Sequence, residues 1–376
     1  MHHLEKKEVI INKKIKKIGI LTGGGDCPGL NSVIRAVAKT AMNDYGCSVV
    51  GIEDGFEGLV QNRMRNLEYA DVSGILTMGG TILGTSNRAD PFEFAEENSS
   101  GKIMKTDRSD DAVSNFHNAG LDALVCIGGD GTMSIADRLM KKGIGIVGVP
   151  KTIDNDIYGT DVTFGFDTAV QIVSEAIDRL HTTAQSHHRV MVIETMGRYA
   201  GWLALCGGVA GGGDIILIPE IPYNLESVIQ FVRKRNSRGN RFSIVVIAEG
   251  VKLPSGDYEI KHRDELSHDP IRLGGIGVWM ARQIESSTGI SSSATILGHL
   301  QRGGTPTAFD RVLATRFGCE AMNQVAKVNF GVLVGLIGTQ IKTTPIKEIA
   351  NKQRLVQQDS ELVRTAISVG TSFGAD

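Results

Sequence analysis

The stretch ALVCIGGDGT, residues 123–132, decides the fold of this chain because an apolar run leads directly into a glycine-rich turn. Such a run is typical of a buried strand that ends at the edge of a sheet. Gly128 and Gly129 allow the backbone to approach a phosphate group closely. Asp130 can bind Mg²⁺, and Thr132 adds a hydroxyl. A tight turn capped by Asp130 is the alternative, and we favour the phosphate-binding interpretation.

A second strand-like run, residues 145–149, leads into PKTIDND at residues 150–156. An aspartate near a substrate hydroxyl can accept its proton while Mg²⁺ and cations balance the phosphate charge. Taken alone, Thr152, Asp154 and Asp156 could form a turn with two solvated acids. Beside the first stretch, they predict phosphoryl transfer.

Strand-like runs alternate with helix-like patterns, which predicts parallel sheets covered by helices. A chain of 376 residues exceeds most single domains, so we expect an α/β protein with two doubly wound domains and mainly parallel sheets. Ligands of such sheets bind at the carboxyl ends of the strands. The other expected strands are 17–22, 48–52, 189–194, 214–218 and 243–248, and the expected helices include 31–42, 167–181 and 224–235.

A glycine-rich turn, GGGDCPG at residues 23–29, joins the first strand to a helix that we expect Asn31 to cap. The amides of this turn could hold an anion, and a merely tight turn explains the pattern equally well. It lacks the GxxxxGK[ST] spacing, which excludes a P-loop. The GxGxxG pattern at residues 143–148 lies inside a strand, so we reject a dinucleotide site there.

Arginine and histidine side chains follow two further strands, next to glycines. Met196-Gly197-Arg198 follows one strand, and His299 and Arg302 follow another. Side chains of this kind suit the recognition of a phosphate dianion. Glu249, after the strand 243–248, could bind sugar hydroxyls or cap a turn.

The composition sets limits on the function. The net charge of −2 gives no bulk basic field, so we do not expect a nucleic-acid partner. No run of about 18 apolar residues occurs, and no membrane partner is expected. The five scattered cysteines form no CxxC pair, which indicates reduced thiols in a cytoplasmic protein. We interpret residues 1–14 as an N-terminal extension.

The motifs together resemble the 6-phosphofructokinase family. GGGDCPG, GGTxLGT (residues 79–85), GGDGT, PKTIDND, MGRxxGW and GHLQRGG occur in that family's order, and the similarity covers about residues 17–320. The resemblance implies two α/β domains with the active site in the cleft between them. The implied domains are 15–165 plus 301–351 for the phosphate donor, ATP, and 166–300 plus 352–376 for the sugar phosphate.

The resemblance also implies the reaction, in which the terminal phosphoryl group of ATP moves to the 1-hydroxyl of fructose 6-phosphate with Mg²⁺ as cofactor. It implies a homodimer or homotetramer with shared active sites, because Arg189 resembles an arginine that reaches the site of a neighbouring subunit. The implied donor-site residues are Gly25, Arg88, Gly129, Asp130 (the Mg²⁺ ligand), Gly131 and Thr132. The implied catalytic residues are Lys151, Thr152, Asp154 (the base) and Arg198, and the implied substrate contacts are Thr152, Asp154, Asp156, Arg189, Met196, Gly197, Arg198, Glu249, His299 and Arg302.

Two positions bear on the choice of donor. Pyrophosphate-dependent members resemble GGDD followed by PKTIDND, and many bacterial ATP-dependent members resemble GGDG followed by PGTIDND. This chain combines Gly131 with Lys151. An aspartate in place of Gly131 would fill the space of the ATP α-phosphate and repel it, so its absence favours ATP over pyrophosphate.

One position departs from the family pattern. Ser293 stands six residues before His299, where many members have an arginine that contacts the sugar 6-phosphate. The loss of such a contact could cost about 1.5–3 kcal/mol. Three interpretations stay open: another cation compensates, the affinity for the sugar is low, or the chain is a non-catalytic regulatory subunit.

Overall fold

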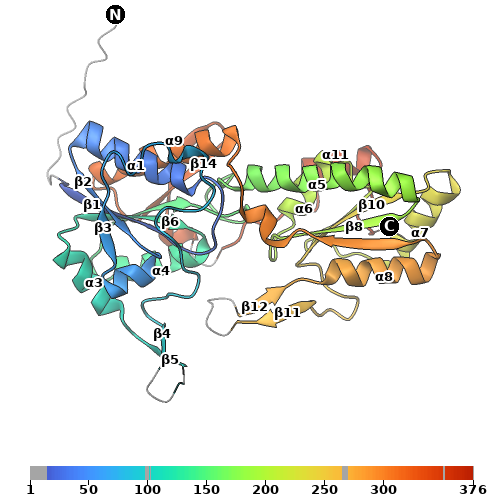
Figure 1. The fold of residues 1–376 in the computed structure, drawn as a ribbon, viewed down its shortest axis with the longest axis horizontal. Coiled ribbons are helices and arrows are strands. Elements are labelled where there is room, and N and C mark those ends of the chain that lie inside the picture. The colour runs from blue at the N-terminus through green and yellow to red at the C-terminus, as the bar shows by residue number, and fades with distance from the viewer. Residues whose placement is uncertain (1–14, 98–100, 102, 265–269, 350–351, 376) are drawn as a thin grey trace, which may run out of the picture. The chain divides into compact units, whose positions relative to one another are not determined.

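The computed structural model describes residues 15–97, 101, 103–264, 270–349 and 352–375 (Figure 1). The extension expected at residues 1–14 lies outside this range. The described residues divide into two compact units. The first comprises residues 15–25, 29–151 and 311–349, and the second comprises residues 26–28, 152–310 and 352–375.

The first unit contains a seven-stranded sheet. Its strands, in order across the sheet, are β15 (Gln340–Pro345), β14 (Val332–Ile337), β7 (Ile146–Pro150), β6 (Ala123–Gly128), β1 (Lys17–Thr22), β2 (Ser48–Ile52) and β3 (Met64–Asn66). The two edge strands, β15 and β3, pair antiparallel, and all other pairs are parallel. β6 and β7 are buried along their whole length, as expected for apolar strands covered on both faces.

The helical elements of the first unit are α1 (Leu30–Tyr45), α2 (Phe56–Gln61), η1 (Ile75–Thr77), α3 (Ser109–Asn118), α4 (Asp130–Met140) and α10 (Ile346–Ile349). One further helix, α9 (Ala308–Ala326), starts in the second unit and ends in the first.

The expectation that Asn31 caps α1 is wrong. Gly29 precedes the helix with φ 102°, and no side chain caps it. The Asn31 side chain instead donates to Met78 O and Gly80 O, because it points from the first turn of the helix into a neighbouring loop.

The second unit contains a four-stranded sheet in which every pair is parallel. Its strands, in order across the sheet, are β13 (Ser292–Ile296), β8 (Val190–Thr195), β10 (Ser243–Ala248) and β9 (Ile215–Leu217). Figure 1 shows α5 (Phe166–His187) and α8 (Ile276–Thr288) on opposite faces of this sheet. The other helical elements are α6 (Trp202–Ala210), α7 (Leu225–Ser237), η2 (Gly298–Arg302) and α11 (Glu361–Ser368).

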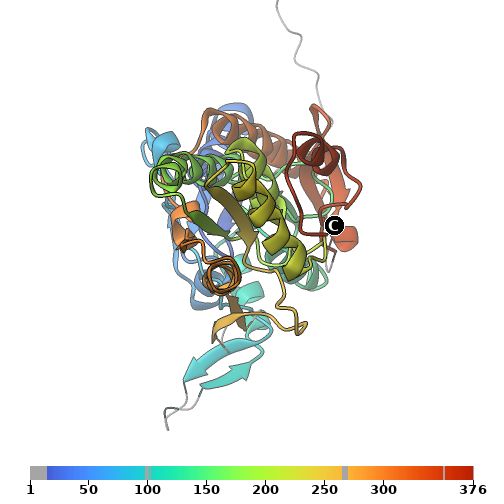
Figure 2. The ribbon, with the colours of Figure 1, turned by 90° about the vertical axis from the view of Figure 1, so that its right-hand side faces the viewer.

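Two antiparallel hairpins complete the described strands. They are β4 (Phe94–Glu97) with β5 (Ile103–Thr106), and β11 (Ile260–Arg263) with β12 (Ile271–Leu273). Figures 1 and 2 both show β4 and β5 extending away from the seven-stranded sheet of their own unit.

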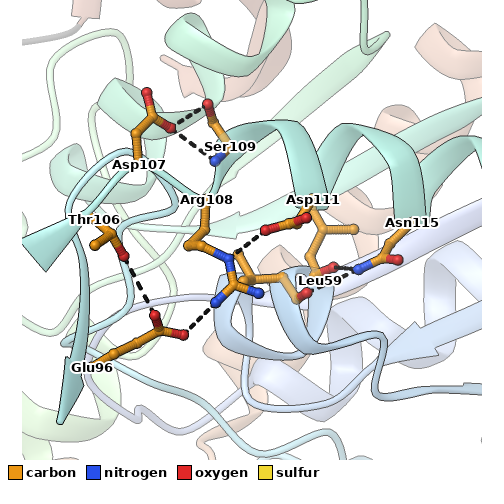
Figure 3. A network of polar contacts seen from close by, with 9 residues as sticks. Leu59, Glu96, Thr106, Asp107, Arg108, Ser109, Asp111 and Asn115 are labelled. Carbon is orange, nitrogen blue, oxygen red and sulfur yellow. Dashed lines mark hydrogen bonds and ion pairs between the residues drawn. The ribbon is translucent and has the colours of Figure 1, made fainter. Parts of the chain in front are cut away.

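Arg108 anchors the β4–β5 hairpin at its base (Figure 3). Its guanidinium forms ion pairs with Glu96 of β4 and with Asp111 of α3. The Thr106 hydroxyl donates to the other oxygen of Glu96 at 3.4 Å. Since the partners come from a strand and from a helix, this network fixes where the hairpin leaves the unit.

The fold confirms the predicted α/β class with mainly parallel sheets. The division between the units differs from the expected one, since residues 152–165 and 301–310 lie in the second unit. Two contacts explain the difference. Arg354 N donates to Asp156 O at 2.7 Å, and Thr168 N donates to Asp310 Oδ2 at 2.8 Å, so both segments pack on residues of the second unit.

The described residues contain no helix long and apolar enough to cross a membrane. All five cysteines are free thiols, and Cys27, Cys47 and Cys126 are buried.

Candidate active site

The GGDGT turn places the start of α4 at the carboxyl end of β6. β6 ends at Gly128, and α4 begins at Asp130. A Cβ atom on Gly128 would lie 2.2 Å from Thr132 Oγ1, whereas one on Gly129 would meet only Lys151 O, at 3.7 Å. The first glycine is therefore required by packing against Thr132. The space around Gly129 is open, so a ligand can approach the backbone before α4. The amides at the start of a helix favour an anion there.

Lys151 joins the two glycine-rich turns of the first unit. Its backbone N–H donates to Gly128 O at 3.0 Å, and its Nζ donates to Gly25 O. The ammonium lies 3.3 Å from the Cβ position of Gly24, which has φ 79°. A single cation is thus held beside both turns, where it can face a bound phosphate.

Arg88 lies in the segment that pairs with the first glycine turn. Gly24 N donates to Ser86 O at 3.0 Å, and Arg88 N donates to Ser86 Oγ at 3.3 Å. Hydrogen bonds therefore connect both glycine turns to Lys151, expected as a catalytic residue, and connect the first turn to the segment of Arg88. The expected donor-site residues all belong to the first unit, namely Gly25, Arg88, Gly129, Asp130, Gly131 and Thr132.

The loop after β7 belongs to the second unit and buries its carboxylates. Thr152, Asp154 and Asp156 are all less than 9% exposed. Asp154 N donates to Thr152 Oγ1 at 3.0 Å, and that hydroxyl donates to Asp154 Oδ2 at 3.2 Å. The second oxygen, Asp154 Oδ1, is buried and accepts no hydrogen bond from the described residues. A buried carboxylate oxygen without a donor is suited to accept a proton from a bound hydroxyl.

The loop after β8 positions Arg198 against Glu249. Arg198 N donates to Glu249 Oε1 at 3.1 Å, and Arg198 has the left-handed φ of 51°. A Cβ atom on Gly250 would lie 1.9 Å from Arg198 O, so only glycine fits after Glu249. A Cβ on Gly197, which has φ 135°, would lie 2.5 Å from Ala200 O. These close backbone contacts fix the Met196–Arg198 turn.

Glu249 also interacts with Asp154 and Arg302. Burial raises the pKa of Glu249 to about 7, and the Asp154 charge raises it further while Arg302 opposes the shift. Arg302, in η2, donates from Nη1 to Asp26 O at 3.2 Å. His299, in the same short helix, is exposed. The structure therefore brings Asp154, Glu249 and Arg302 together at the carboxyl ends of the strands of the second unit.

The raised pKa of Glu249 predicts a pH dependence of stability. The folded state binds a proton between pH 4.5, the ordinary value, and about pH 7, where the unfolded state does not. Stability therefore falls as pH rises through that range. In the wild type, the free energy of urea unfolding should fall by about 1–3 kcal/mol between pH 5 and pH 8 because of Glu249. Glu249→Gln has no titrating carboxyl at this position, so this part of the fall should be absent. Glu68→Gln, at an exposed acid, should leave the fall intact, and an unchanged pH dependence in Glu249→Gln would contradict the assignment.

Arg189, which the resemblance implies reaches the site of a neighbouring subunit, lies apart from the other expected site residues of its own unit. It precedes the first residue of β8, whereas Met196–Arg198 follow the last. A strand of six residues spans about 20 Å, so Arg189 lies at the opposite end of the sheet from Arg198. Ser293 pairs with Met191, near the same end of β8. The structure thus separates these two positions from the site at the carboxyl ends.

Sequence reasoning missed Arg354. The Arg354 guanidinium lies over the Trp202 ring at 4.2 Å from its centroid and donates to Asn155 O at 3.2 Å. Trp202 and Asn155 are 152 and 199 residues away from Arg354 in sequence, and no local pattern marks Arg354 as their partner. Trp202 was visible as the last letter of MGRxxGW, but its partner was not.

The described residues contain no group of three or more His, Cys, Asp or Glu side chains that could hold a metal ion. A single carboxylate, Asp130, at the glycine-rich turn before α4 is compatible with Mg²⁺, which commonly binds through one or two carboxylates and the substrate phosphates.

A parallel α/β fold with glycine-rich turns, a buried carboxylate and arginines at the strand ends is typical of phosphotransferases. The chain belongs to the phosphofructokinase family, whose profile, described as "Phosphofructokinase", matches residues 17–325. This finding confirms the resemblance noted in the sequence.

Several named proteins are similar to this chain. "ATP-dependent 6-phosphofructokinase 2" of Clostridium perfringens is 48% identical over 360 residues, covering 96% of this chain and 98% of the relative. "Pyrophosphate--fructose 6-phosphate 1-phosphotransferase" of Amycolatopsis mediterranei is 48% identical over 341 residues, covering 90% of this chain and 96% of the relative. The two names differ in the phosphoryl donor.

Solved structures agree in fold. The Pichia pastoris phosphofructokinase in the T-state is 32% identical with a TM-score of 0.75, and the match covers 96% of this chain and 37% of the Pichia chain. The pyrophosphate-dependent phosphofructokinase of Marinobacter aquaeolei has a TM-score of 0.77 at 21% identity over 93% of this chain and 88% of that one. At this identity the second match supports the fold alone.

Proposed function

We propose that this chain is an ATP-dependent 6-phosphofructokinase, which transfers the terminal phosphoryl group of ATP to the 1-hydroxyl of fructose 6-phosphate in glycolysis. The observation that carries the chemistry is the buried Asp154 Oδ1, which accepts no hydrogen bond from the described residues. The donor is supported by relatives 48% and 49% identical, from Spirochaeta thermophila and Chloroflexus aggregans, that are named ATP-dependent 6-phosphofructokinase. The cytoplasm is the proposed location, where glycolysis operates.

The donor site would use residues of the first unit. The amides at Gly129 and Gly131 and the start of α4 would receive the phosphates, with Lys151 and Arg88 balancing their charge. Asp130 would hold Mg²⁺, which when bound neutralises charge on the transferred phosphate. Gly25 and Thr132 would complete the site, since both lie at the two turns that Lys151 joins.

The acceptor site would use residues of the second unit. Asp154 would take the proton of the 1-hydroxyl, with the Thr152 hydroxyl fixing its other oxygen. Arg198 would stabilise charge on the transferred group. The sugar phosphate would also contact Asp156, Met196, Gly197, Glu249, His299 and Arg302.

Arg189 fits a different role, because it lies at the far end of β8 from this site. Its buried Nε donates no hydrogen bond to any of the described residues. We propose that Arg189 reaches the sugar-phosphate site of a neighbouring subunit, which would make the active enzyme a homodimer or homotetramer.

Pyrophosphate is the second candidate donor, and Lys151 together with the Amycolatopsis relative supports it. The test is the formation of fructose 1,6-bisphosphate by the purified protein with Mg²⁺, in parallel with ATP and with pyrophosphate. We expect turnover with ATP, because Gly131 adds no carboxylate near the α-phosphate. Turnover with pyrophosphate alone would assign the donor to the second candidate. No turnover with ATP or with pyrophosphate would favour a regulatory subunit. In that case Ser293, in place of an arginine, would explain a lost affinity for the sugar phosphate.

A further inference from the structure

Arg354 contacts the loop that carries the proposed base. Its backbone N–H donates to Asp156 O at 2.7 Å, and its Nη1 donates to Asn155 O at 3.2 Å. Both acceptors directly follow Asp154 in the chain. Two backbone carbonyls next to the reacting carboxylate are therefore held by one residue of the C-terminal segment.

The same residue contacts the segment that follows the Arg198 turn. The Arg354 guanidinium stacks on Trp202, and Trp202 Nε1 donates back to Arg354 O at 2.9 Å. The Glu220 carboxylate supports this junction, because it accepts from Gly201 N at 2.9 Å and from Val356 N at 3.0 Å. The C-terminal segment is thus bonded to both loops of the proposed acceptor site.

Each of these loops contains a residue with a left-handed backbone. Asn155 has φ 55°, which asparagine adopts more readily than most residues, and Arg198 has φ 51°, which is strained for an arginine. Such conformations persist where the surroundings over-determine them. The Nη1 bond fixes the carbonyl of Asn155 itself, and the Trp202 stack fixes the end of the loop that carries Arg198.

We propose that Arg354 is a positioning residue for phosphoryl transfer, which holds the Asp154 loop and the Arg198 loop in one mutual arrangement. This inference rests on the proposed function. A planar guanidinium can stack on an indole and donate in its own plane at the same time, and a lysine ammonium cannot. Because both loops belong to the second unit, the effect should fall on the chemical step rather than on the binding of ATP.

The test compares Arg354→Ala and Arg354→Lys with the wild type in kcat, KM for ATP and thermal unfolding. We expect Arg354→Ala to lower kcat at least about tenfold, since a misplacement near 1 Å can cost a hundredfold. KM for ATP should stay within about twofold. Arg354→Lys should recover part of kcat, because it keeps the charge but loses the planar contact. Arg364→Ala, at an exposed arginine of α11, is the matched control and should match the wild type.

The outcomes separate this inference from the proposed function. An inactive wild type would contradict the proposed function itself. An active wild type, with Arg354→Ala at normal kcat per folded molecule and only a lower melting temperature, would show a purely structural role and overturn the inference. If Arg354→Ala does not fold, Arg354→Lys is the deciding variant. A lower kcat, with the melting temperature and the KM for ATP of the wild type, would support the positioning role. A normal kcat would overturn the inference.

Discussion

Asp154→Ser should lower kcat by about 10²–10⁴-fold while KM for fructose 6-phosphate changes by less than about threefold. Asp154 is 5% exposed, and its Oδ1 accepts no hydrogen bond from the described residues. Its Oδ2 is fixed by the Thr152 hydroxyl. A serine at this position cannot accept the proton as a carboxylate does, whereas the other proposed sugar contacts, such as Glu249 and Arg302, remain in place. Steady-state kinetics with saturating ATP and Mg²⁺ measure both parameters.

The control for this variant is Asp359→Ser, which removes an exposed acid from the same unit. It should have wild-type kcat and KM. Circular dichroism and thermal unfolding should show that both variants are folded. A near-normal kcat in folded Asp154→Ser would contradict the assignment of Asp154 as the base. An equal loss of kcat in Asp359→Ser would show that the effect is not specific to Asp154.

Gly131→Asp should lower the ATP-supported kcat/KM at least about a hundredfold, because like charges placed face to face cost several kcal/mol. Gly131 lies in the first turn of α4, beside the amides proposed to receive the donor phosphates. The added carboxylate would repel the α-phosphate of ATP and occupy its space. Pyrophosphate has no third phosphate, so the ratio of pyrophosphate-supported to ATP-supported activity should rise.

Asn118→Asp is the matched control, since it adds the same charge to the first unit at an exposed position at the end of α3. It should leave kcat/KM for ATP unchanged. An ATP-supported rate in Gly131→Asp close to that of the wild type would show that this position does not decide the donor. The choice would then rest on other residues, with Lys151 the first to be tested.

The sheets were predictable because their strands are apolar runs bounded by glycine and polar residues. The expected strands 17–22 and 48–52 match β1 and β2 to the residue. The helix expected at 167–181 continues to His187 as α5, because its C-terminal turns are polar and carry a weak periodic signal. The boundary between the units could not be predicted, since contacts far apart in sequence decide it.

The candidate site was predictable where the residues follow a strand directly. Asp130, Asp154 and Arg198 each lie within a few residues of a strand end, where the ligands of parallel sheets bind. Asn31 was misassigned because a side chain one residue inside a helix resembles a cap in sequence. Arg354 could not be predicted because its contact with the Asp154 loop is made to Asn155, 199 residues away in sequence.

³¹P NMR of the wild-type protein with ATP, Mg²⁺ and fructose 6-phosphate shows whether the chain transfers a phosphoryl group to the sugar. We expect a second phosphate ester on the sugar, at the 1-position, with one ADP formed for each sugar phosphorylated. Release of inorganic phosphate without a new sugar ester, or an unchanged spectrum, would contradict it.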